Sequence, residues 1–161
     1  MSQVEEVKLD FPDGCNVILG YSHFIKTVED LTEIIATTRP DASFAIAFSE
    51  ASGERLIRWD GNNKKLIDIA VENIKKIGAG HTFLIILENV FPISIMNQIK
   101  NCQEVGRIFA ATSNPLYVLV YRNVQGGGVV GVVDGYSPLG TENEVDIEKR
   151  KSLLRRIGYK K

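Results

Sequence analysis

The feature that most constrains the fold is a run of three strand-like segments with no helix between them. Residues 105–112, 116–122 and 128–134 are rich in apolar and β-branched residues, and only short turns separate them. Parallel neighbours need a crossover of about a dozen residues or more, so a purely parallel sheet is excluded. Elsewhere strand-like and helix-like segments are intermingled. The sequence therefore predicts an α/β fold with helices on both faces of one mixed β-sheet.

Apolar periodicity and helix-end signals place the remaining elements. Thr27 is expected to cap the first helix, Pro92 opens the third, and Gly78 ends the second. The predicted helices cover residues 27–38, 64–77, 92–101 and 145–157, and further strands are expected at 4–11, 15–19, 43–48, 55–59 and 81–88.

Length and charge narrow the class of protein. The 161 residues suit one domain spanning 1–161, and the balance of 19 basic and 20 acidic residues offers no broad positive face for nucleic acid. The basic residues after position 148 are read as a solvated helix face, with electrostatic docking as the less favoured alternative. No membrane span or signal segment is recognised in the sequence, so we expect a cytoplasmic protein. Cys15 and Cys102 lack metal-ligand spacing, and we expect them to be reduced thiols.

The segment 20-GYSHFIKT-27 places polar side chains before a predicted helix start. A helix amino end with Ser22, Thr27 and Lys26 beside it could hold a phosphate, and His23 could accept a phosphoryl group as a nucleophile. The structural alternative is a turn with a capping threonine and a histidine bonded to backbone. Spacing alone favours that alternative.

The second histidine lies in 78-GAGHTFLI-85. Gly78 is expected to end a helix, Gly80 to allow close approach to the backbone, and His81 to stand at the start of a strand. A structural role is again favoured for this histidine alone. Two histidines in such surroundings are more suggestive together, but spacing leaves open whether they meet.

A glycine run at 126–131 formally matches the dinucleotide-binding pattern G-x-G-x-x-G. A strand follows it where that motif needs a helix, so a flexible hairpin tip is the favoured interpretation. The phosphate-binding pattern of P-loop proteins is absent from the sequence.

Two polar segments flanked by strands supply further candidates, 49–59 and 134–144. Glu50 and Asp134 are candidate carboxylates, with Asp134 as a base or metal contact. Arg55 and Arg58 are three residues apart, so in a strand they face opposite sides and at most one is expected in a given cleft. Surface ion pairs are the alternative for the charged residues. Tyr136 could stack on a base, and ordinary packing is the alternative for it.

Taken together, these blocks resemble the adenosine-specific kinase family, a small family of single-domain proteins best represented in archaea. The resemblance runs from about residue 8 to the end of the chain and rests on these segments: GYSHFIKTVEDL, AFSEASGERLIRW, GAGHTFLI, FPISIMNQIK, RIFAATSNP, GVVDGYSPLG and RKSLLRRIGY. It implies a three-layer α/β/α sandwich, binding of adenosine or AMP, and a phosphohistidine intermediate.

The family motifs fall on Ser22, His23, Lys26 and Thr27, on Glu50 to Arg58, on Gly78 to His81, and on Asp134 to Gly140. The resulting hypothesis assigns catalysis to His23, Lys26 and Asp134, with His23 as the phosphoryl acceptor because Lys26 is its nearby cation. Substrate binding is assigned to Ser22, Thr27, Glu50, Arg55, Gly78, Gly80, His81, Tyr136 and Ser137.

A second hypothesis is a non-catalytic module that binds adenosine or AMP as a sensor. The missing glycine loop for a triphosphate donor favours it, whereas the histidine beside phosphate-binding residues favours catalysis. No metal ligands are assigned, and Mg²⁺ is considered only as a companion of a phosphoryl donor. Apolar residues on both faces of 116–121 predict a homo-oligomer such as a trimer, with this half of the chain at the contact.

Overall fold

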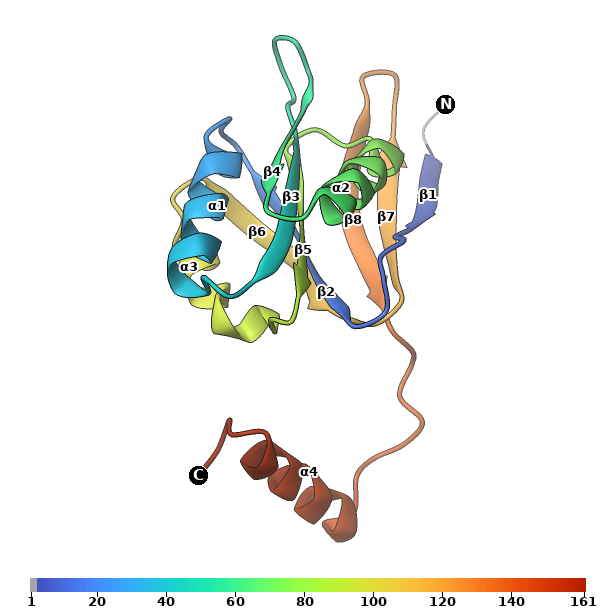
Figure 1. Ribbon diagram of the computed structural model, residues 1–161. Helices are drawn as coiled ribbons and strands as arrows, with labels where there is room; N and C mark the ends of the chain where they lie inside the picture. Colours follow the sequence, from blue (N-terminus) through green and yellow to red (C-terminus); the bar gives the residue numbers. More distant parts are fainter. Residues whose placement is uncertain (1–2) are drawn as a thin grey trace.

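The structure is a computed structural model and describes residues 3–161. Figure 1 shows the elements, which are β1 (Gln3–Lys8), β2 (Cys15–Ser22), α1 (Thr27–Thr38), β3 (Ser43–Ser49), β4 (Ile57–Gly61), α2 (Lys64–Ile77), β5 (Thr82–Glu88), the 3₁₀ turn η1 (Pro92–Ser94), α3 (Met96–Lys100), β6 (Val105–Thr112), β7 (Leu116–Arg122), β8 (Gly127–Asp134) and α4 (Glu144–Arg156). The α/β class is confirmed, and most predicted bounds agree within two residues. Three elements differ by more. The helix expected at 92–101 divides into η1 and the short α3, because Ile95 departs from helical geometry. β1 ends at Lys8, three residues before its predicted end, and β2 runs to Ser22, three residues beyond its predicted end.

The strands form two sheets in place of the single mixed sheet that was predicted. One sheet has five strands in the order β4-β3-β5-β2-β6, the other has three in the order β1-β7-β8, and all these pairs are antiparallel. The helix α1 does join two strands that run the same way, β2 and β3, as a crossover should. They are not neighbours, however, because β5 inserts between them and pairs antiparallel with both.

The five-stranded sheet is apolar on both faces and separates two cores. On one face Ile18, Ile46 and Ile85 pack against α1 and α3, and on the other Val17, Ala45 and Ile86 pack against α2 and β7. Residues of β2, β3 and β5 alternate between these clusters, as expected for strands buried on both sides. The three-stranded sheet therefore shares one face of the larger sheet with α2 (Figure 1).

Local signals fix α2 and thereby the loop that follows it. The side chain of Asn63 accepts a hydrogen bond from the Leu66 N–H at 3.2 Å, and Gly78 ends the helix in the left-handed conformation at φ +56°. The loop after Gly78 leads directly to His81 and β5.

The chain after Asp134 leaves this compact part of the molecule. We call residues 3–135 the body and residues 136–161 the arm. The arm consists of an extended stretch and α4, which begins with a capping box between Asn143 and Asp146 (Figure 1). α4 lies wholly within the described residues and contains no buried residue. Among residues 3–161, no helix is both long and apolar enough to cross a membrane.

Candidate active site

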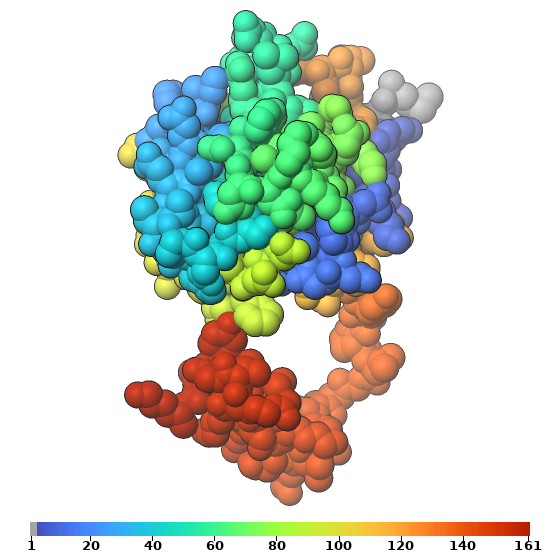
Figure 2. Space-filling model, in the orientation of Figure 1, coloured from blue at the N-terminus to red at the C-terminus, as the bar shows by residue number. Residues whose placement is uncertain are grey.

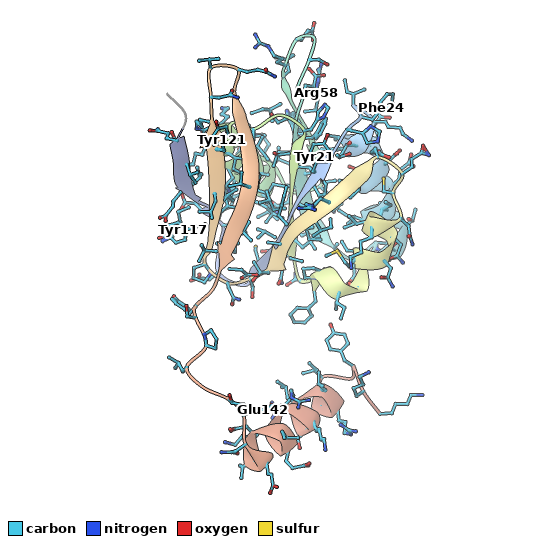
Figure 3. All side chains as sticks on the ribbon, turned by 180° about the vertical axis from the view of Figure 1, so that it is seen from behind. Tyr21, Phe24, Arg58, Tyr117, Tyr121 and Glu142 are labelled. Atoms are coloured by element: carbon cyan, nitrogen blue, oxygen red, sulfur yellow. The ribbon has the colours of Figure 1, made fainter. Side chains whose placement is uncertain are left out.

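The two histidines line the same cleft. This histidine cleft has a volume of about 330 Å³ and is lined by His23, Phe24, Ile25, Phe48, Glu50, Ala51, Ser52, Gly53, Glu54, Arg58 and His81. Figure 3 shows two of these residues, Phe24 and Arg58, at the same end of the molecule. The fold thus brings together two imidazoles that lie 58 positions apart in the chain.

His81 is held rigidly just before β5 begins at Thr82. Its backbone has φ +61°, which is unusual for a residue other than glycine, and its N–H donates to the Ser49 carbonyl at 2.7 Å. Its own carbonyl accepts from the Ser22 N–H at 2.9 Å, and its ring stacks on Phe48 and meets the edge of Tyr21. The imidazole is therefore positioned by neighbours on two strands, β2 and β3.

His23 is more exposed and lies on the loop between β2 and α1. Its N–H donates to the Glu104 carbonyl at 3.1 Å, which anchors the loop while leaving the ring at the surface of the cleft. An exposed imidazole that is anchored through its backbone is suited to meet a reactant.

Ser22 and Thr27 hold this loop from within. Both side chains are fully buried, their hydroxyl oxygens lie 2.5 Å apart, and Ser22 Oγ also donates to the Glu104 carbonyl at 3.1 Å. The Thr27 hydroxyl donates to the Phe24 carbonyl, so it does not cap α1 as expected; the cap position is Lys26, which makes no side-chain capping bond. This arrangement favours a loop-holding role for both hydroxyls over direct contact with a ligand.

Lys26 lies in a separate depression with acidic neighbours. Its ammonium is 3.1 Å from the Asp30 carboxylate and 3.9 Å from the Glu104 carboxylate, and the hydrogen bond to Asp30 raises the pKa of Lys26. Asp30, Cys102 and Glu104 bring their ligand atoms within 4.8 Å of one another, and burial with the nearby Glu104 raises the pKa of the Cys102 thiol to about 12. The ammonium of Lys26 supplies positive charge to this cluster and lies apart from the histidine cleft.

Arg58 brings a cation to the histidine cleft. Its guanidinium donates to Glu50 Oε1 at 2.8 Å and lies 3.3 Å from Glu54 Oε2. The Leu56 N–H donates to Glu50 Oε2 at 3.0 Å, and this bond, followed by the pairing with Arg58, holds the pKa of Glu50 below its ordinary value. Glu50 is thus an ionised anchor that orders the hairpin between β3 and β4.

A second cleft adjoins the first and shares Glu50 and Ala51 with it. This glycine cleft has a volume of about 730 Å³ and is lined by Ser49, Glu50, Ala51, Arg55, Ile57, Ile74, Lys75, Gly78, Gly80, Tyr121, Asn123, Gln125, Gly126, Gly127 and Gly128. Arg55 and Arg58 lie in different clefts, but strand alternation does not cause this, because Arg55 precedes β4 in a turn with φ +52°. The glycine run does form the start of β8 after a hairpin tip, and it also lines this cleft.

Gly80 sets the distance between the two loops that form these clefts. A Cβ added at Gly80 would lie 2.8 Å from the Ala51 Cβ, closer than real side chains approach. Gly80 was expected to allow another group to approach the backbone closely. That group is Ala51, which lines both clefts.

Asp134, Tyr136 and Ser137 do not join this site within one chain. Asp134 is at the opposite end of β8 from Gly127, about 23 Å away for a strand of that length, and accepts hydrogen bonds from Thr112 and Asn114. Tyr136 is 88% exposed and begins the arm with Ser137. Asp134 does not line the histidine cleft of its own chain, and its assignment as a catalytic carboxylate stays a prediction.

Several lining residues escaped the sequence interpretation. Arg58 lies in the family motif from Glu50 to Arg58 but received no role of its own, and Phe24, Phe48 and Tyr121 carry no local signal beyond packing. The strand-spacing rule does not apply to Arg55, which lies outside β4, so only the tertiary structure shows which arginine meets the histidines.

Comparison with known proteins agrees with these features. A family described as adenosine specific kinase matches residues 7–160. In its crystal structure, the PH1918 protein of Pyrococcus horikoshii OT3 is 38% identical and superposes with a TM-score of 0.95, covering 100% of this chain and 99% of that one. A search of curated proteins found no match. The chain belongs to the adenosine specific kinase family.

Proposed function

We propose that the protein binds adenosine or AMP and transfers a phosphoryl group to or from the nucleoside through a phosphohistidine at His23. The observation that carries this proposal is the meeting of His23 and His81 in one cleft that also contains Arg58. Membership of the adenosine specific kinase family supports the nucleoside as substrate.

In the proposed reaction a neutral ring nitrogen of His23 donates its lone pair to the phosphorus of a donor. The N–P bond forms as the donor's P–O bond breaks and its electron pair leaves with the donor oxygen. A hydroxyl of adenosine then attacks the phosphorus and loses its proton, and the N–P electron pair returns to the imidazole. Arg58 supplies the charge that steadies the phosphoryl oxygens, a role first assigned to Lys26.

The adjoining glycine cleft is the proposed nucleoside site. Its volume of about 730 Å³ lies within the roughly 300–1,000 Å³ usual for ligand sites, and Tyr121 and the backbone of Gly126–Gly128 line it. His81, fixed at the border of the two loops, would hydrogen-bond the ribose or the base. We expect AMP or adenosine to bind more tightly than ATP, and any Mg²⁺ would come with the phosphoryl donor. Calorimetry that gives equal or tighter binding of ATP would contradict this order.

The second candidate function is binding without turnover, as a nucleotide sensor. The observation in its favour is that the guanidinium of Arg58 is already paired with Glu50 and Glu54. A phosphoryl group would have to compete with these two carboxylates for the same cation.

The deciding experiment incubates the protein with adenosine and candidate phosphoryl donors and measures the masses of product and protein. We expect acid-labile phosphate on the protein, lost in His23→Asn, while the adenosine affinity of that variant stays within about tenfold, or 1.4 kcal/mol. His81→Asn should weaken adenosine binding by more than that. Phosphate found on His81, or full phosphorylation of His23→Asn, would overturn the assignment. Adenosine binding with neither phosphoprotein nor product would support the sensor.

We also propose that the protein acts in the cytoplasm as a homo-oligomer such as a trimer. Exposed apolar side chains on the outer face of the three-stranded sheet support the oligomer, among them Val4, Val130 and Val133.

A further inference from the structure

We propose that Asp30, Cys102 and Glu104 form a binding site for a zinc ion beside the first turn of α1. The inference goes beyond the proposed function and is independent of phosphoryl transfer, because the site adjoins the depression around Lys26 and lies apart from the histidine cleft. Each of the three side chains brings one ligand atom within 4.8 Å of the other two. Within residues 3–161, this is the group of three potential ligands that the structure assembles.

Two neighbouring segments build this site. Asp30 lies in the first turn of α1, whereas Cys102 and Glu104 lie in the turn between α3 and β6. That turn is fixed by the Val105 N–H, which donates to the Cys102 carbonyl at 3.0 Å. α1 and α3 cover the same face of the five-stranded sheet (Figure 1), so common packing positions the ligands. The ligands come from distant parts of the chain, and for this reason their spacing carried no metal signal.

The carboxylate of Glu104 is the observation that points to a cation. Its side chain is 1% exposed, and neither carboxylate oxygen has a hydrogen-bond partner among the described residues. The ammonium of Lys26 lies 3.9 Å from Glu104 Oε2, which is beyond hydrogen-bond distance, and it is closer to Asp30, at 3.1 Å. Buried carboxylates are normally paired or coordinate a metal, since an unpaired charge away from water is costly. An ion bound to Glu104 would supply such a partner.

The charges of the cluster fit a divalent ion. With the thiol of Cys102 protonated, the two ionised carboxylates and the Lys26 ammonium leave a net charge of −1. When Cys102 binds as a thiolate, the three ligands carry −3, and a divalent ion together with Lys26 brings the total to zero. A neutral total favours a site whose carboxylate is buried.

The donor atoms select a thiophilic ion. A thiolate suits zinc, whereas magnesium and calcium prefer oxygen ligands. Coordination deprotonates a thiol outright, so the S–H bond of Cys102 gives way to an S–Zn bond and the proton passes to solvent. Ligand atoms about 2.0–2.3 Å from a tetrahedral zinc ion lie roughly 3.3–3.8 Å from one another, so small side-chain rotations close the cluster.

The site has an entry path from solvent. The adjoining depression has a volume of about 360 Å³ and is lined by Asp30 and Cys102, and Figure 2 shows α1 on the outer surface of the body. Three protein ligands leave the fourth position of zinc to water. The bound ion would tie α1 to the turn before β6, whose Glu104 carbonyl anchors the His23 N–H. We therefore assign it a structural role beneath the His23 loop.

Calorimetric titration of the full chain with Zn²⁺, after removal of metal with a chelator, tests the proposal. Cys102→Ser and Glu104→Gln each replace one ligand with little change in shape. Glu33→Gln is the matched control for the carboxylate, because Glu33 lines the same depression but lies outside the cluster. Cys15→Ala is the control for the thiol, because Cys15 is buried in the other core cluster.

We expect one Zn²⁺ per chain in the wild type and in both controls. Cys102→Ser and Glu104→Gln should each lower the affinity at least about a hundredfold, since loss of an outer-shell partner alone costs roughly 10–100-fold. Co²⁺ bound to the wild type should show the charge-transfer absorption of a cobalt–thiolate bond, and Cys102→Ser should lack it. Zn²⁺ should raise the midpoint of thermal unfolding of the wild type, whereas Mg²⁺ and Ca²⁺ should neither do so nor displace it.

Four results would overturn the proposal: no Zn²⁺ binding by the wild type, displacement of Zn²⁺ by Mg²⁺, an equal loss of affinity in Glu33→Gln, or a cobalt–thiolate band that persists in Cys102→Ser. Circular dichroism checks that each variant is folded. If Glu104→Gln does not fold, the cobalt spectra of the wild type and Cys102→Ser decide. Adenosine binding by the wild type, measured in parallel, reports separately on the proposed function.

Discussion

Arg58 differs from the other basic residues near the histidines in what surrounds it. Its guanidinium lines the histidine cleft and is 37% exposed, within reach of a ligand. Lys26 is close to His23 in sequence, yet its ammonium faces Asp30 and the buried Glu104. At the scale of single residues, therefore, the cation nearest to His23 along the chain differs from the cation that lines its cleft.

The first prediction compares these two cations. Arg58→Met should weaken AMP binding about tenfold or more relative to adenosine, because a charge-assisted hydrogen bond contributes roughly 1.5–3 kcal/mol. Lys26→Met should leave the ratio of AMP to adenosine affinity unchanged. It should instead lower the free energy of unfolding, since the buried carboxylate of Glu104 loses its neighbouring cation. Calorimetry measures the ratio of AMP to adenosine affinity, and urea unfolding measures stability. A lowered ratio in Lys26→Met would contradict the prediction.

The second prediction concerns the carboxylate of Glu50 and acid. Its pKa is held below the ordinary value by the Leu56 N–H and by Arg58, so its contribution to the order of the hairpin is complete above that ordinary value. The contribution is lost only as the pH falls through the lowered pKa. Trp59, the single tryptophan, follows Arg58 and reports on this hairpin by fluorescence. The emission should be constant above about pH 5 and change below pH 4. In Glu50→Gln this acid transition should be absent, and its persistence there would refute the assignment.

At the scale of elements, two short loops meet at Gly80 and Ala51 and together border both clefts. The loop after α2 exists because Gly78 ends that helix, and the facing loop is ordered by Glu50. Helices and strands were predicted well from periodicity and end signals. The order and direction of the strands within the sheets were not predicted. They depend on β5, which inserts between β2 and β3 and runs antiparallel to both.

A substitution at Gly80 tests the close contact between these loops. Gly80→Ala should destabilise the fold by about 1–3 kcal/mol, since the new Cβ would lie 2.8 Å from that of Ala51 and one loop must shift. It should also weaken adenosine binding if the nucleoside lies in the glycine cleft. Gly128→Ala is the control for stability alone, because its added Cβ meets nothing within 4 Å although Gly128 lines the glycine cleft. Urea unfolding of the two variants gives the comparison, and equal stabilities would rule out the contact.

At the scale of the whole molecule, the body contains both hydrophobic cores, and the arm contributes to neither. If the chain forms the proposed homo-oligomer, association and stability are linked by mass action. The midpoint of thermal unfolding of the wild type should then rise with protein concentration. Scanning calorimetry over a hundredfold range of protein concentration checks this expectation. A wild-type midpoint that does not move would argue against a coupled oligomer.

The sequence by itself determined the local structure of this protein. The periodicity of 27–38 and 64–77, the stop at Gly78 and the turn-linked strands from 105 to 134 depend on neighbours within a few residues, so they were readable along the chain. The two histidine segments were recognised for the same reason, since glycine and hydroxyl residues beside an imidazole are local features.

Only the tertiary structure decided how distant segments meet. It placed His23 and His81 in one cleft, turned Lys26 toward Asp30, brought Arg58 to the histidines and left Asp134 at the far end of β8. It also separated β7 and β8 into a second sheet and set the arm apart from the body. These outcomes depend on which apolar faces cover one another, a property of the packed molecule that local patterns do not carry.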